Sequence, residues 1–305
     1  MLDFLPEQER NIFIYWDQGL DSAPPVVKLC VRQIRQLHPQ WKIHELDARN
    51  ISGYAGPSQL GSGAFDALPI QKQSNLYRMQ LLLEHGGVWF DSTVFPVISL
   101  DSWLTGRMGE GVFLFQRPGP DRLVANWFMA ARKGNRLLGR VVEDYCAYWR
   151  DNRFRHIGHP RSIVGRSLTR VLSLNLVLPL IWLSKPVTKL VRVSPYFAFH
   201  YNFYRTLRSD ADLWAQWQRV PFLSAEPAHR LQRHGLGEPV TAEVREWLTQ
   251  PISPVFKLSW KVTDGVKHNS VLEHLERVVA PSENLAVPCE PLNESGRARF
   301  QENRL

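Results

Sequence analysis

Apolar side chains recur at helical spacing just upstream of residue 86. Leu76, Met79 and Leu83 lie three to four residues apart and predict a helix over 73–85 that packs through this stripe. Gly86 follows at once. Glycine readily takes the left-handed backbone conformation that ends a helix, which residues with a β-carbon adopt only at a cost. The pattern therefore predicts that the helix stops at this glycine.

A short buried strand follows the helix and ends in a carboxylate. The apolar run 88–90 suits a strand, and Asp91 comes directly after it. In open α/β sheets, ligands bind beyond the carboxyl ends of the strands. Asp91 is therefore predicted at the mouth of such a crevice, where a carboxylate can hold a divalent cation or a sugar hydroxyl.

The start of the chain predicts a β-loop-α-β unit. Residues 11–16 suit a buried strand, and residues 41–46 alternate between apolar and polar as a second strand does. Between them, Pro24 and Pro25 open a predicted helix, because proline is tolerated in a first helical turn. This order of elements favours a nucleotide-binding type of α/β sheet with mostly parallel strands.

Further along, the pattern predicts alternating strands and helices. Residues 53–67 are rich in Gly and Ser and indicate a loop. The elements predicted after it are strands over 112–116 and 127–131, an amphipathic helix from Gly134, and a final amphipathic helix over 263–279.

Residues 153–192 differ in character from the rest. Residues 171–183 are almost wholly apolar but too short to span a bilayer, which takes about 20 residues. Basic residues flank this run: Arg155, Arg161, Arg166, Arg170, Lys185, Lys189 and Arg192. The combination is typical of an element that lies in the plane of a membrane surface. The alternative is a buried helix hairpin with solvated ends.

Composition narrows the class of partner. The 305 residues are 44% apolar and 22% charged, as in ordinary globular proteins with one large α/β domain or two small ones. A formal net charge of +8 and a pI near 9.6 favour anionic partners, namely nucleotide-sugar phosphates, nucleic acid or an anionic membrane surface. Since no nucleic-acid-binding module is recognisable, nucleic acid is not predicted.

Cysteine usage and the first residues indicate a compartment. Three cysteines, far apart and odd in number, favour a reducing environment and show no zinc-site spacing. The N-terminal residues lack the basic start and apolar core of a signal peptide. We therefore expect a cytoplasmic protein, peripheral at the inner face of the membrane if residues 153–192 bind lipid.

Residues 74–91 resemble the central signature of the capsular polysaccharide synthesis glycosyltransferases, which are relatives of the glycosyltransferases with the DXD sugar-binding motif. The signature of that family is Ser-Asp-x-x-Arg, a short helix, and Gly-Gly-x-Trp/Tyr-x-Asp. Here Ser74, Arg78 and the run 86–91 match it, whereas Asn75 replaces the Asp. Weaker similarities extend the resemblance over most of the chain, at residues 11–19, 126–131 and 254–261.

The resemblance implies an architecture. It is a single GT-A-like α/β domain over residues 1–280, with a Rossmann-type, mostly parallel central sheet and flanking helices. Residues 153–192 would be a helical insertion in this domain, and residues 281–305 a polar tail.

Sugar transfer from a nucleotide donor needs stabilisation of the negative charge that develops on the leaving diphosphate. Asp91 is the candidate to bind Mg²⁺ or Mn²⁺, or to contact the donor sugar, and Thr93 can hydrogen-bond a sugar. The second carboxylate of an Asp-x-Asp motif is absent, so dependence on a divalent cation is left open. The alternative is a clamp of basic side chains from Arg78, Lys257 or Lys261.

By resemblance, the 73–85 helix would contact the nucleotide-sugar. A loop at 254–261 that folds over the nucleotide would bring the charges of Lys257 and Lys261 to its phosphates. The residues assigned to donor binding are Tyr15, Trp16, Ser74, Asn75, Arg78, Gly86, Gly87, Lys257, Trp260 and Lys261. Tyr15 and Trp16 end the first predicted strand, where they can stack on the nucleobase or belong to the core.

Two histidines complete the candidates. His200 lies in the aromatic run 196–201 and resembles a family histidine near the acceptor. Its alternative is a buried histidine with satisfied hydrogen bonds. His268 is a candidate metal ligand from late in the chain.

The predicted function is transfer of a sugar from a nucleotide-sugar to a surface polysaccharide or its lipid-linked precursor. One alternative is a phosphotransferase or nucleotidyltransferase, which would need more carboxylates than Asp91 with the distant Asp101 and Glu110. The other is a non-catalytic subunit of a membrane polysaccharide assembly complex, which suits the missing carboxylate and the basic apolar segment.

Overall fold

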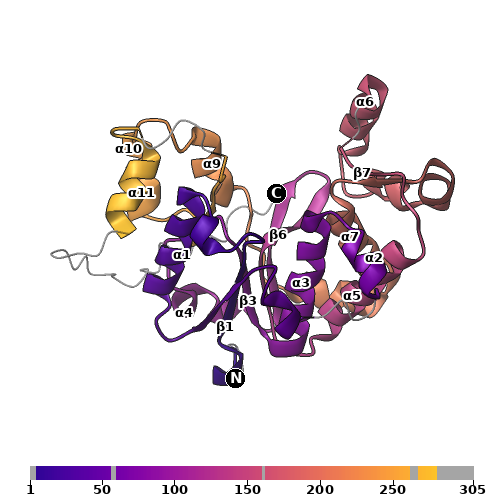
Figure 1. The fold of residues 1–305 in the computed structure, drawn as a ribbon, viewed down its shortest axis with the longest axis horizontal. Helices are drawn as coiled ribbons and strands as arrows, with labels where there is room; N and C mark the ends of the chain where they lie inside the picture. Colours follow the sequence, from indigo (N-terminus) through magenta and orange to yellow (C-terminus); the bar gives the residue numbers. More distant parts are fainter. Residues whose placement is uncertain (1–4, 56–59, 160–161, 262–266, 280–305) are drawn as a thin grey trace.

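A five-stranded sheet forms the centre of the molecule (Figure 1). The computed structural model describes residues 5–55, 60–159, 162–261 and 267–279. The sheet has the order β2–β1–β3–β6–β5, with strands β1 (Asn11–Tyr15), β2 (Lys42–Leu46), β3 (Gly87–Asp91), β5 (Val112–Gly119) and β6 (Arg122–Ala131). Two smaller pairs join β4 (Val94–Pro96) to β9 (Val255–Lys257) and β7 (His156–Gly158) to β8 (Val193–Pro195).

The sheet is parallel in one half and antiparallel in the other. β1 pairs in parallel with β2 and β3, as the β-loop-α-β order predicts. β6 is antiparallel to both β3 and β5. Only residues 120–121 separate β5 from β6, and so short a turn can only return the chain in the opposite direction. The prediction of a mostly parallel sheet is confirmed for the first three strands and corrected to a mixed sheet overall.

Helices cover both faces of the sheet because side chains alternate along each strand. Trp89 points to the face under α3 (Ile70–His85), where the Arg78 guanidinium lies 5.0 Å from its ring. Phe90 points to the other face and meets His38, which follows α1 (Pro25–Leu37), at 6.0 Å between ring centroids. Figure 1 shows α1 and α4 (Leu100–Trp103) on one side of the sheet, and α3 and α5 (Arg136–Arg150) on the other.

The predicted helices near residues 73–85 and after Gly134 are confirmed as α3 and α5. The interpretation of residues 53–67 as a loop is wrong in one part, because Ser62–Asp66 form the short helix α2. Phe65 explains this turn, since the helix buries its side chain in the main core.

The C-terminal region builds a second apolar cluster on the outer side of α1. Val31 and Ile34 of α1 belong to the main core, whereas Val26 and Leu29 belong to this second cluster. The helices that contribute to it are α9 (Arg230–His234), α10 (Ala242–Thr249) and α11 (Val271–Val279). β9 of this region pairs antiparallel with β4, which returns the chain to the edge of the sheet where β3 ends. The predicted final helix is the shorter α11, and residues 262–266 lie outside the described residues.

The predicted insertion is anchored at one end and exposed at the other. Its elements between β7 and β8 are α6 (Ile163–Leu172), a 3-10 helix η5 (Leu178–Leu183) and a π-helical turn η6 (Pro186–Val191). η5 packs on α7 (Ala198–Ser209) and buries Trp182 and Leu183. α6 stands out from the body in Figure 1 and leaves Ile163 and Val171 exposed, so the buried hairpin is wrong for this helix.

Across the described ranges, no helix combines the length and apolar character needed to cross a bilayer. The predicted polar tail, residues 281–305, lies outside these ranges.

Candidate active site

Asp91 lies where the carboxyl ends of β1 and β3 meet. It is in register with Tyr15, the last residue of β1. The antiparallel pair β4–β9 sets Val94 opposite Lys257, so the closing motif reaches the same edge of the sheet. Strand ends from three distant parts of the chain therefore form one group of polar side chains.

Both carboxylate oxygens of Asp91 face a cation. Arg78 Nη2 lies 3.2 Å from Oδ1, and Lys257 Nζ lies 3.4 Å from Oδ2. Trp89 Nε1 also donates a hydrogen bond to Oδ1 at 2.9 Å. Burial alone would raise the pKa of Asp91, but the charges of Arg78 and Lys257 outweigh it and hold that pKa below its usual value. Asp91 is therefore ionised at neutral pH.

Arg78 is fixed in the core of the site. Its side chain is 6% exposed and stacks over the Trp89 ring. Nε donates to the Ser74 carbonyl and Nη2 to the Ser74 hydroxyl, both at 3.1 Å, and Nη1 donates to the Asn126 carbonyl. The spacing of Ser74 and Arg78 by four residues puts them on one helical face, as the sequence predicts. Burial lowers the pKa of Arg78, yet a guanidinium remains charged at neutral pH.

Asn75 is buried and links α3 to its neighbours. Its carbonyl oxygen accepts from Asn126 Nδ2 at 2.9 Å, and its amide donates to the Tyr145 hydroxyl of α5 at 3.4 Å. With these contacts Asn75 ties the helix of Arg78 to β6 and α5. Asn126 was not among the sequence candidates, although it opens a stretch that resembles the family.

Thr93 and Lys257 join the β4–β9 pair to Asp91. The Thr93 hydroxyl accepts a hydrogen bond from Lys257 Nζ, and its carbonyl accepts from the Leu258 N–H at 2.8 Å. Lys257 is 18% exposed at its side chain, so it reaches solvent while Arg78 does not. The structure thus brings together four predicted residues: Asp91, Thr93 and Lys257, with Arg78 from α3.

Two tryptophans form an aromatic pair at the rim. The rings of Trp16 and Trp260 meet edge to face at 6.0 Å, and Trp260 is 47% exposed. Lys261 Nζ lies 5.7 Å from the Trp260 ring. Tyr15, by contrast, packs on Tyr77 at 5.4 Å and is 8% exposed, as a core residue is. Of these two aromatic residues, Tyr15 is buried and Trp16 is half-buried.

His200 of α7 is buried beside the cationic side of the site. It is 7% exposed, and its Nδ1 lacks a hydrogen-bond partner in the described structure. Burial, and after it the charges of Arg122, Lys72 and Arg78, hold the pKa of His200 well below its usual value. The imidazole is therefore neutral at pH 7. The alternative of a buried histidine with satisfied hydrogen bonds is wrong for Nδ1.

The sequence did not predict the residues around His200. Lys72 is 4% exposed and its Nζ donates to the Tyr196 carbonyl, and burial lowers its pKa to about 8. Arg122 lies over the Phe197 ring at 4.2 Å. Nothing in the local pattern distinguishes this lysine from a surface residue. The Trp89 contact with Asp91 had a signal, since residues two apart on a strand share a face.

Two glycines and one histidine of the prediction lie away from Asp91. Gly86 and Gly87 precede or begin β3, so Asp91 is about 13 Å further along at 3.3 Å per residue. A β-carbon on Gly87 would lie 2.4 Å from the Asn11 carbonyl oxygen, which gives this glycine a structural reason. His268 is 90% exposed at its side chain and pairs with Glu273 at 3.5 Å.

The site does not fit a divalent cation. Mg²⁺ and Mn²⁺ are held by carboxylates and other oxygen ligands. The group contains one carboxylate, Asp91, and its two oxygens face Arg78 and Lys257, so the three charges sum to a positive value. In the part of the chain that the structure describes, no three His, Cys, Asp or Glu side chains cluster as a metal site.

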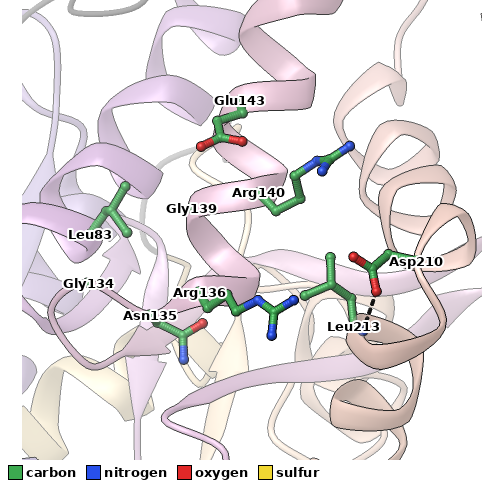
Figure 2. A pocket seen from close by; sticks show the side chains of 9 residues that line it. All are labelled: Leu83, Gly134, Asn135, Arg136, Gly139, Arg140, Glu143, Asp210 and Leu213. Carbon is green, nitrogen blue, oxygen red and sulfur yellow. Dashed lines mark hydrogen bonds between the residues drawn. The ribbon is translucent and has the colours of Figure 1, made fainter.

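A separate cavity of about 330 Å³ opens between the start of α5 and α8 (Ala211–Arg219), as Figure 2 shows. It adjoins the end of β6, which pairs with the start of β3, and so lies opposite to Asp91. Two of its charged side chains serve the fold, since Arg140 pairs with Asp144 at 3.1 Å and Asp210 caps α8. This cavity is not part of the group around Asp91.

Residues 4–156 match a family model described as capsular polysaccharide synthesis protein. The chain belongs to this family. The matched half contains Arg78 and Asp91, and Lys257, which contacts Asp91, lies beyond it. The group around Asp91 thus includes a residue from the C-terminal half of the chain.

Curated relatives are glycosyltransferases of fungi. The chain is 26% identical over 160 residues to the O-glycosyltransferase braB of Annulohypoxylon truncatum, covering 46% of this chain and 38% of that one. It is 26% identical over 163 residues to the O-glycosyltransferase PaGT of Phomopsis amygdali, covering 48% and 40%. The matches thus span about two fifths of these relatives' length, and the chain is a distant homologue of glycosyltransferases.

Among solved structures, the PaToxG glycosyltransferase corresponds to 80% of this chain and 84% of its own. The TM-score is 0.38 and the sequence identity 14%.

Proposed function

We propose that this family member transfers a sugar from a nucleotide-sugar donor, which binds at the group formed by Asp91, Arg78 and Lys257. The observation that carries the proposal is the ionised Asp91 at the strand ends, held between two cations. Such a group suits a nucleotide-sugar, because the carboxylate can accept hydrogen bonds from sugar hydroxyls and the surrounding cations can bind a diphosphate. Distant homology to glycosyltransferases supports the same function.

The two cations have different parts in this proposal. Arg78 keeps Asp91 ionised and oriented, because its own contacts to Ser74 and Asn126 fix it. Lys257 is the more exposed cation, so its ammonium can turn from Asp91 to the donor diphosphate. It would stabilise the negative charge that grows on the diphosphate as its bond to the sugar breaks. Trp16 and Trp260 would hold the nucleobase at the rim.

His200 is the proposed base on the acceptor side. Its imidazole is neutral and its Nδ1 is buried without a partner among the described residues, so His200 takes up the proton of an acceptor hydroxyl only where that hydroxyl reaches the buried Nδ1. The acceptor oxygen then forms the new bond to the anomeric carbon while the diphosphate leaves with the electron pair of the old bond. Thr93 and Ser74 remain candidates for hydrogen bonds to the donor.

We further propose that residues 1–280 form one GT-A-like domain that works at the cytoplasmic face of a membrane. Its acceptor would be a surface polysaccharide or a lipid-linked precursor. The phosphotransferase alternative is less well supported, because the other two candidate carboxylates have structural partners of their own. Asp101 accepts a hydrogen bond from Trp41 at 3.1 Å, and Glu110 pairs with Arg219 at 2.7 Å.

The test is thermal shift with a panel of nucleotide-sugars on the wild type, Asp91→Asn and Lys257→Ala, with Asp66→Asn as an exposed matched control. A donor that binds only the folded state raises the melting temperature by mass action. We expect a shift with one donor in the wild type and the control, and its loss in both site variants. A panel without any shift would instead favour the non-catalytic subunit.

A further inference from the structure

Exposed apolar side chains concentrate in one segment. Of thirteen large hydrophobic residues that the described structure exposes, nine lie between residues 163 and 196. They are Ile163, Leu168, Val171, Leu174, Val177, Ile181, Leu190, Val191 and Tyr196. Scattered single residues of this kind are ordinary, but a concentration like this one marks an interaction surface. We call these nine residues the apolar face.

In helix α6, the residues of the apolar face lie on one side of the helix. Ile163, Leu168 and Val171 fall within one side of a helix at 100° per residue, and all three are exposed. Arg166 and Arg170 are exposed next to this side. α6 thus turns an apolar stripe with a basic border away from the protein.

Charge distribution separates this segment from the rest of the molecule. Residues 153–192 contain eight basic and no acidic residues. The chain holds 37 basic and 29 acidic residues in total, so the remainder carries 29 of each. The whole formal net charge of +8 therefore resides in this one segment.

We infer that residues 153–196 dock on an anionic lipid bilayer. The occupant of this surface must accept exposed apolar side chains and balance a purely basic border at the same time. The interface of a bilayer with anionic headgroups does both, because its acyl boundary takes up apolar side chains and its phosphates attract Lys and Arg. The short η5 and α6 elements lie in the plane of such an interface and do not cross it.

The docked segment leads directly into the wall of the site. The Tyr196 carbonyl accepts a hydrogen bond from Lys72, and Phe197 lies under Arg122. Both cations border His200. Docking would therefore hold the His200 side of the site close to the bilayer, where a lipid-linked acceptor is presented. The docking deepens the membrane location proposed above, and it does not depend on the proposed sugar transfer.

The experiment is flotation of the full chain with vesicles of phosphatidylcholine, alone or mixed with phosphatidylglycerol. We expect binding to the mixed vesicles and a drop of about tenfold or more for Ile163→Ser/Leu174→Ser/Leu190→Ser. The control is Phe222→Ser/Val278→Ser, which removes exposed apolar residues elsewhere and should bind as the wild type does. Arg166→Gln/Arg170→Gln/Lys185→Gln should abolish the preference for anionic vesicles, as should high salt.

Either of two results would overturn the docking proposal: no binding of the wild type to anionic vesicles, or equal binding by the triple serine variant. Light scattering detects a different outcome, in which the apolar face joins two copies of the chain. In that case the wild type is a dimer, the serine variant is a monomer, and neither binds vesicles. Thermal shift with the nucleotide-sugar is expected to survive in the serine variant. Failure of docking and failure of the donor site are therefore distinguishable.

Discussion

At the scale of single residues, Arg78 has a structural part and, in the proposed function, a chemical one. Its guanidinium bonds to α3 through Ser74, to β6 through Asn126 and to β3 through Asp91. Breaking a buried ion pair leaves the remaining charge unpaired, which commonly costs about 3–5 kcal/mol. Loss of activity in an Arg78 variant would therefore not separate a donor contact from a disrupted core. Lys257, which is partly exposed, is the better probe.

The pairing of Asp91 predicts how donor binding depends on metal. Because both carboxylate oxygens face cations, we expect the nucleotide-sugar dissociation constant to change by less than about twofold between EDTA and Mn²⁺. Calorimetric titration of the donor in each buffer measures this. If binding vanished in EDTA and returned with Mn²⁺, a metal ion would have replaced Lys257 beside Asp91, and the prediction would be wrong.

His200 predicts a pH dependence of stability. Its pKa is lowered in the folded state, so between that value and about 6.5 the unfolded state binds more protons. Stability is then full above pH 6.5 and is lost as pH falls below it. His200→Gln should reduce the acid slope by up to ~1.4 kcal/mol per pH unit.

Urea unfolding at several pH values between about 7 and 5 measures this slope. His268→Gln is the matched control, because that side chain is 90% exposed. Equal slopes for the wild type and His200→Gln would contradict the burial of a neutral imidazole.

At the scale of elements, Gly87 determines where β3 can begin. Its φ is +118°, and a β-carbon would lie 2.4 Å from the Asn11 carbonyl oxygen of β1. We expect Gly87→Ala to destabilise the protein by about 3 kcal/mol or more. Gly63→Ala in α2 is the control, because its β-carbon meets no atom within 4 Å, and it should be neutral or slightly stabilising. Chemical denaturation of both variants measures their free energies of unfolding. Similar losses of stability in the two variants would contradict the steric role of Gly87.

The sequence predicted the elements that carry their own local pattern. α3 and its stop at Gly86, the strand before Asp91 and the parallel β1–β2–β3 half all follow from spacing and glycine conformation. The antiparallel β5–β6 half was missed because strand direction depends on the turn at 120–121, which apolar runs do not encode.

The site was predictable only where its residues share one motif. Asp91 and Arg78 lie within fourteen residues of sequence, so spacing and resemblance select both as candidates, and the structure places them in contact. Lys72 and Arg122 lie near His200 through tertiary packing alone, and no local signal distinguishes them. Gly86 lies next to the start of β3, whereas Asp91 is at its end. To exclude Gly86 from the site, the prediction would have had to consider the direction of the strand.

At the scale of the whole molecule, the second apolar cluster supports the site through β9. Leu275 of α11 is fully buried in the same cluster as Phe256, which precedes Lys257. Leu275→Ala should cost about 3 kcal/mol and also weaken donor binding, since the cavity loosens the packing behind β9. The control Val278→Ala, on the same helix but 56% exposed, should change neither.

Denaturation and donor titration on both variants measure the two effects together. Destabilisation without any change in donor affinity would mean that β9 holds Lys257 without help from α11.

The pairing of β4 with β9 also has a consequence for the order in which a newly made chain gains its chemistry. Lys257 follows Asp91 by 166 positions, so the ribosome releases the carboxylate long before its second cation. Domains fold largely from the N-terminus during synthesis, and contacts between distant positions form late. A nascent chain that already holds the parallel strands would keep Asp91 beside Arg78 alone. The ability to bind the proposed donor would therefore be acquired in one late step, when β9 pairs with β4.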